Sequence, residues 1–255
     1  MDENTERPGY EPEAPPERPG AKAHRYGPLQ RLWMAFTSPG EVFADIRVKP
    51  AWLLCLVAMV VLGIGVQLVV APHIDTEATL RARLGDRADD LSDQQIEDIV
   101  ERGERFAGFA PIIGAVVSPV ALALMAAVFF LMLKIVGSDA DYPQVFSSAL
   151  HSYWPPAVVQ SALTAILIQR FDTLPQQELP TVVKSHLGAL LSPDAPAWLA
   201  SAANTISVFN IWTVALLVIG FTIVGRVSRG RAAVAALVPW VVWLAAKAGL
   251  GALMG

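Results

Sequence analysis

The chain has 255 residues, of which 54% are hydrophobic and only 16% charged, and its formal net charge is −4. An acidic chain without blocks of basic residues excludes nucleic acid as a partner, and a single cysteine, Cys55, excludes an intramolecular disulfide. Charged residues are absent from five long runs, 50–74, 106–133, 142–169, 195–225 and 232–246. A soluble α/β domain would interrupt its buried elements with charged turns, so these runs indicate membrane-spanning helices.

Residues 1–27 form an acidic, proline-rich segment with few large apolar side chains. Such a segment cannot bury enough apolar surface to offset its chain entropy, and we predict a solvated, disordered cytoplasmic tail. It also differs from a cleavable secretory signal, so we expect the first span to act as the insertion signal.

Residues 28–50 have the pattern of two short amphipathic helices. Apolar side chains recur at helical spacing from Leu29 to Phe36, and the segment that follows has Ser38 as a candidate N-cap, Pro39 as the first helical residue and Glu41 as a capping-box partner. Each helix is too short to span and combines aromatic with basic residues, as helices in the headgroup region do. We expect four aromatic side chains to anchor this region at the interface: Trp33, Phe36, Phe43 and Trp52.

The first two spans are predicted at Trp52–Ala71 and Phe109–Leu133, separated by a polar outer loop over residues 72–105. Ser92 and Gln95 form a capping box at the start of an amphipathic helix in this loop. The helical spacing of its apolar residues predicts that this helix continues directly into the second span.

The third run begins at Tyr142-Pro143 and contains Pro155-Pro156, which predict a break or kink in any helix through it. Two interpretations remain open: a kinked span, or an interfacial helix over residues 144–154 followed by a span that begins at Trp154. A bend within the bilayer requires neighbouring helices to satisfy the freed carbonyl groups.

A second polar outer loop, residues 170–200, precedes a fourth span at Thr205–Val224, and an arginine-rich turn leads to a fifth at Ala233–Ala252. The predicted fold is therefore an all-α, polytopic integral membrane protein with five transmembrane helices in a domain over residues 51–255. With the N-terminus in the cytoplasm, eleven Lys and Arg face inside and seven face outside, in agreement with the positive-inside rule. The C-terminus is then outside.

No Asp or Glu lies in a predicted span, and nucleophile, metalloprotease and nucleotide-binding motifs are missing, so we expect no enzymatic activity, catalytic residue or cofactor. The four histidines lie in four different segments, so no metal site is predicted. Neutral polar side chains in the spans form the remaining candidate, a hydrated intramembrane site of His151, Gln160 and Asn210 beside Pro155 and Pro156. The alternative is that these side chains only hydrogen-bond between helices of the bundle.

Three stretches, TSPGEVFADI, LSDQQIEDI and VGSDADYPQVFSSALHSYWPP, occur in an order that resembles bacterial members of the Yip family. These five-span proteins are related to the Ypt/Rab-interacting membrane proteins of the eukaryotic secretory pathway. The resemblance covers about residues 28–254. It implies a non-enzymatic membrane protein that shapes or organises membranes or recruits other proteins to them.

Eukaryotic members have an Asp-Leu-Tyr-Gly-Pro motif, of which this chain retains Tyr26-Gly27-Pro28 but has His24-Arg25 in place of the first two residues. Their Gly-Tyr pair in the third span corresponds here to Leu150-His151, with Pro155 retained. These departures argue against transferring GTPase binding.

We expect a protein of the inner (cytoplasmic) membrane that acts in membrane organisation, scaffolding or recruitment, with the lipid bilayer, itself or other membrane proteins as partners. A small transporter or channel that uses the proline-kinked third span is the alternative.

Overall fold

The computed structural model describes residues 26–88, 90–192 and 195–254, so the predicted tail lies almost entirely outside the described residues. Within these ranges the chain is all-helical, with only isolated bridges in place of strands. The helices are α1 (Pro28–Thr37), α2 (Pro39–Val48), α3 (Leu53–Val70), α4 (Thr76–Leu84), α5 (Asp93–Ala107), α6 (Ala110–Ile135), α7 (Tyr142–Leu167), α8 (Leu179–Val182), α9 (Ala197–Thr205), α10 (Val208–Gly225) and α11 (Arg229–Met254).

Four helices, α3, α6, α10 and α11, are long and apolar enough to cross a membrane. They correspond to the predicted first, second, fourth and fifth spans, with ends that differ by at most a few residues. The chain is therefore a multi-pass membrane protein. Its helices are uniformly apolar around most of their circumference because lipid surrounds them.

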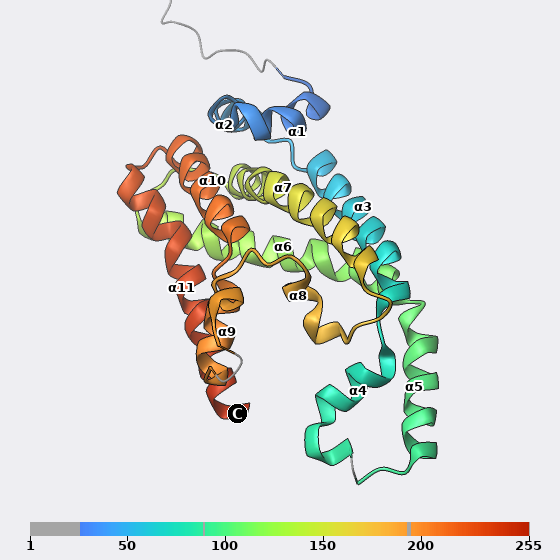
Figure 1. Cartoon of the computed structure of the whole chain (residues 1–255). Helices are drawn as coiled ribbons and strands as arrows, with labels where there is room; N and C mark the ends of the chain where they lie inside the picture. The colour runs from blue at the N-terminus through green and yellow to red at the C-terminus, as the bar shows by residue number, and fades with distance from the viewer. Residues whose placement is uncertain (1–25, 89, 193–194, 255) are drawn as a thin grey trace, which may run out of the picture.

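The predicted third span corresponds to α7, a single helix of 26 residues. It is long enough to cross a membrane, but its mean hydropathy is lower than that of the other four helices. It packs against α3, α6 and α10, and Figure 1 shows it in the middle of the bundle. The predicted break at Pro155-Pro156 is wrong, because α7 continues through both residues. Two consecutive prolines remove only two N–H donors, and a helix packed by its neighbours tolerates that loss.

The amphipathic helix of the first polar loop also differs from the prediction. Its capping box at Ser92 and Gln95 is confirmed, but α5 ends at Ala107 instead of continuing into the second span. Gly108 and Phe109 form a turn, and Figure 1 shows α5 and α6 meeting there at a bend. Pro111 in the first turn of α6 explains the new start, because proline favours the first turn of a helix over its interior.

The core lies where α2, α6, α7, α10 and α11 meet. Gly220 of α10 permits the closest approach, since a Cβ atom there would clash with Ser148 Oγ and lie 3.1 Å from Phe43 Cε1. Around this core, α4 and α5 project beyond the ends of α3 and α6, and α9 packs along α11 (Figure 1).

Candidate functional site

The first candidate site is built around the N-terminal hairpin, the pair of helices α1 and α2. Ser38 occupies the N-cap position of α2 and Pro39 is its first residue, as predicted, although the Ser38 side chain makes no capping hydrogen bond within the described residues. Glu41 accepts a hydrogen bond from the Tyr26 hydroxyl. This contact ties the start of α1 to the first turn of α2.

A buried ion pair joins the two helices of the hairpin. Arg31 is fully buried, and its Nε and Nη2 atoms both lie 2.8 Å from Asp45 Oδ2, whose side chain is 5% exposed. Arg31 Nη1 also donates to the Lys49 carbonyl at 2.9 Å. A buried guanidinium is tolerated only with such partners, so the pair fixes the geometry of α1 relative to α2.

Three hydrogen bonds attach the hairpin and the following link to α7. Gln144 Nε2 donates to the Arg47 carbonyl at 2.7 Å, and the Ala51 N–H donates to Ser147 Oγ at 3.2 Å. Trp154 Nε1 donates to the carbonyl of Leu32 in α1 at 3.1 Å. Their donors and acceptors on α7 span about three helical turns, so the hairpin is held along α7 at several points.

The structure does not bring together the three predicted intramembrane polar residues. His151 is 1% exposed, bonds through Nδ1 to the Ser147 carbonyl at 2.8 Å, and lies near Arg31 on the hairpin side of α7. Gln160 is exposed. Asn210 donates to the Thr205 carbonyl at 2.6 Å, at the start of its own helix. Nine residues of α-helix rotate Gln160 to the face opposite His151, so these two side chains point away from each other, and Asn210 lies on a different helix, α10.

Pro155 and Pro156 are both buried within α7 and do not border an opening in the helix. The discontinuity that motivated the transport hypothesis is therefore absent from α7. The two residues act as packing surface within the bundle.

The four predicted interfacial aromatic residues have different surroundings. Trp33 is 71% exposed and its ring lies 6.2 Å from that of Phe36, which is half-buried. Trp52 is 38% exposed and packs against the Phe146 ring. Phe43 instead is fully buried beside Gly220 in the protein core, so three of the four side chains remain accessible to the interface.

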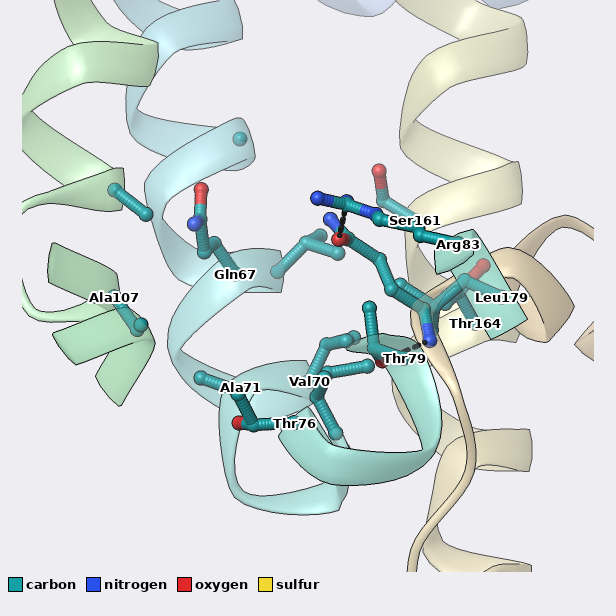
Figure 2. Close-up of a pocket in the computed structure, with 16 residues that line it drawn as sticks. Gln67, Val70, Ala71, Thr76, Thr79, Arg83, Ala107, Ser161, Thr164 and Leu179 are labelled. Carbon is teal, nitrogen blue, oxygen red and sulfur yellow. Dashed lines mark hydrogen bonds between the residues drawn. The ribbon is translucent and has the colours of Figure 1, made fainter. Parts of the chain in front are cut away.

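A second candidate site, the loop-side cleft, lies at the opposite end of the bundle. It has a volume of about 680 Å³ and is bounded by α3, α4, α7, the junction of α5 with α6, and the segment from Gln176 to Leu179. Figure 2 shows the side chains of Arg83 and Ser161 extending into the space between α3 and α7. Arg83 Nη2 donates to Gln176 Oε1 at 2.7 Å, and the Gln176 N–H donates to Thr79 Oγ1 at 2.9 Å.

Neither the Arg31–Asp45 pair nor this cleft was predicted from the sequence. Arg31 and Asp45 are oppositely charged residues on two adjacent amphipathic helices. Their opposite charges could have predicted an ion pair between the two helices. The cleft has no comparable signal, because its walls come from five separated segments.

Among residues 26–88, 90–192 and 195–254, no three His, Cys, Asp or Glu side chains gather closely enough to hold a metal ion.

Comparison with known proteins identifies the family. The Yip1 domain profile matches residues 33–249, from α1 to α11. The chain belongs to the Yip1-domain family. It is also 26% identical over 211 residues to the membrane protein YknW of Bacillus subtilis (strain 168), covering 81% of this chain and 84% of that protein. No solved structure matches the chain.

The family match includes the loop-side cleft and most of the N-terminal hairpin, but Arg31 lies just before its first residue. It begins within α1, so most of the docked hairpin is part of the Yip1 domain. The Tyr-Gly-Pro sequence noted above precedes the match, and it supplies Gly27 as the N-cap and Pro28 as the first residue of α1. The Leu150-His151 pair and Pro155 all lie buried in the middle of α7.

Proposed function

We propose that this Yip1-domain protein is a non-enzymatic, five-span scaffold of the cell membrane whose N-terminal hairpin recruits a membrane protein at the cytoplasmic face. The N-terminus is cytoplasmic and the C-terminus lies outside. The observation that carries the proposal is the hairpin itself, which is fixed rigidly to the bundle while it exposes an apolar face.

The length and surroundings of α7 support a fifth span. A helix of 26 residues is about 39 Å long, enough for a hydrocarbon core of about 30 Å. Its polar side chains explain its low hydropathy: Ser147, Ser148, His151 and Ser152 are all at most 1% exposed. Because neighbouring helices cover these four side chains, the polar residues in the first half of α7 are shielded from lipid, and Gln160 is the exposed polar side chain of its second half.

The distribution of cations supports the orientation. Two hydrogen bonds gather the helix ends here: Gln144 at the start of α7 donates to the Arg47 carbonyl of α2, and Ser138 Oγ on the connection from α6 to α7 donates to the Gly225 carbonyl of α10 at 3.0 Å. Six exposed cations surround this end of the bundle: Arg47, Lys49, Lys134, Arg226, Arg229 and Arg231. An end enriched in Lys and Arg on short connections faces the cytoplasm.

The exposed face of the hairpin supports a recruiting role. Leu29 and Trp33 are 74% and 71% exposed, one helical turn apart on α1. A loosely attached amphipathic helix would serve as a lipid anchor, but this one is positioned by the Arg31–Asp45 pair and by α7. Fixed geometry contributes to recognising a protein surface, since a preorganised surface loses less entropy on binding.

A photo-crosslinking amino acid introduced in cells at Trp33 tests the proposal, with Leu68 as the matched control. Leu68 is a similarly exposed apolar residue, but it lies on α3 in the membrane-spanning region. We expect a discrete protein adduct at position 33 that decreases when Asp45→Asn is added, and lipid adducts at position 68. Lipid adducts alone at both positions would mean that the hairpin is only a membrane anchor.

A further inference from the structure

The loop-side cleft has the charge pattern of a site for an anion. Of the described side chains that line it, Arg83 is the one that carries a full charge, and none is acidic. The remaining polar groups are neutral, among them Gln67, Thr76, Ser161 and Thr164. Within the described residues the Arg83 guanidinium gives one donor to Gln176, and a guanidinium has five donors, enough to bind a phosphate as well.

The cleft extends into the membrane-spanning part of the bundle. On α3 its wall runs from Val70 back to Gly63, two helical turns from the helix end. Small residues at Gly63, Gly103 and Ala107 leave this space open. Arg83, Thr76 and Thr79 therefore lie at the loop end of the cleft, whereas Gly63 and Val66 extend its wall to the depth of the acyl chains, where Gln67 and Ser161 add neutral polar groups.

Two smaller cavities continue the cleft along the seam between α3 and α6. The first, about 100 Å³, shares Gly63 and Gln67 with the cleft. The second, about 440 Å³, shares Met59 and Val60 with the first and is lined almost entirely by apolar side chains. The three cavities adjoin in a line that leads from Arg83 toward the middle of the span.

We propose that the loop-side cleft binds an anionic phospholipid from the leaflet that contacts α4 and α5. Its phosphate is held by Arg83 with the neutral polar side chains, and one acyl chain lies along the α3–α6 seam. This site goes beyond the recruiting role of the hairpin, which lies at the other end of the bundle. The cavity volume falls within the range of about 300–1,000 Å³ that is usual for small-molecule sites.

Native mass spectrometry of the purified full-length protein in detergent tests the headgroup contact, with phosphatidylglycerol and phosphatidylcholine as probes. We expect the wild type to retain one phosphatidylglycerol in preference to phosphatidylcholine. Arg83→Gln should weaken phosphatidylglycerol binding roughly tenfold, because a charged hydrogen-bond partner is lost. Arg81→Gln is the matched control: Arg81 lies on the same helix, but pairs with Glu77 and does not line the cleft.

The acyl-chain position is tested by Gly63→Leu against Gly65→Leu. Both glycines lie on α3 with open space where a Cβ atom would be added, but only Gly63 lines the cleft and the adjoining cavity. Gly63→Leu should abolish retention of the lipid and Gly65→Leu should preserve it. The proposal is overturned if wild type and Arg83→Gln bind phosphatidylglycerol equally, or if the wild type retains the two lipids equally. It is also overturned if Gly63→Leu and Gly65→Leu have equal effects on lipid retention.

Discussion

Asp45→Asn should loosen α1 against α2 within the N-terminal hairpin and destabilise the protein. Arg31 and Asp45 have side-chain exposures of 0% and 5%, and the closest N–O distance between them is 2.8 Å. Asparagine preserves the size of the side chain but removes the negative charge that faces the buried guanidinium. Removing one partner of a buried ion pair costs about 3–5 kcal/mol, which at about 2–4 °C per kcal/mol lowers the melting temperature by roughly 6–20 °C.

Cys55 provides the assay, because it is the chain's single cysteine, is 1% exposed, and belongs to the same core cluster as Leu32 of α1. Its reaction with a thiol-reactive fluorophore during heating in detergent reports loss of that core. Glu77→Gln is the control, since it breaks an Arg–Glu pair whose side chains are 45% and 55% exposed, and such a pair contributes at most about 1 kcal/mol.

The double variant Arg31→Met/Asp45→Leu removes both charges and should recover most of the lost stability, because the two buried charges disappear together. The reasoning is refuted if Asp45→Asn melts like the Glu77→Gln control. It is also refuted if the double variant melts as low as the single one.

Three further substitutions test the packing around α7 in the same thermal assay. Gly220→Ala should destabilise by about 1–3 kcal/mol, because its Cβ would clash with Ser148, whereas Gly65→Ala should have little effect; equal effects would contradict the close approach. His151→Leu should be neutral or stabilising, since Nε2 has no hydrogen-bond partner among the described residues; a loss above about 1 kcal/mol would reveal an essential polar contact. Trp154→Phe should cost about 1 kcal/mol through its lost hydrogen bond to the hairpin, and an unchanged melting temperature would disprove that contribution.

The four apolar spans could be predicted from the sequence because lipid imposes the same requirement on every exposed position of such a helix. The ends of α3, for example, differ by one residue from the predicted Trp52–Ala71. The relative direction of His151 and Gln160 could also be predicted from the sequence. Nine residues amount to two and a half helical turns, so the two side chains face opposite directions on a continuous helix. Because α7 continues through both prolines, His151 and Gln160 keep this opposed spacing, and the structure does not bring them together.

The contacts that fix the hairpin could not be predicted. Phe43 has the same aromatic character as Trp33, and its burial depends on Gly220, which lies far away in the sequence and leaves room for it. The Arg31–Asp45 pair likewise depends on how α1 and α2 fold against α7. Local patterns reveal that these helices are amphipathic, but tertiary packing determines which side chains contact protein and which contact lipid.

Passage of α7 through the membrane is tested most directly by labelling two engineered cysteines in intact cells with a membrane-impermeant maleimide. Asp139→Cys and Lys184→Cys, each in a Cys55→Ser background, place exposed cysteines on the connections before and after α7. Labelling of position 184 from outside, with position 139 labelled only after permeabilisation, is the result expected of five spans. Labelling of both positions from the same side would show that α7 does not cross the membrane.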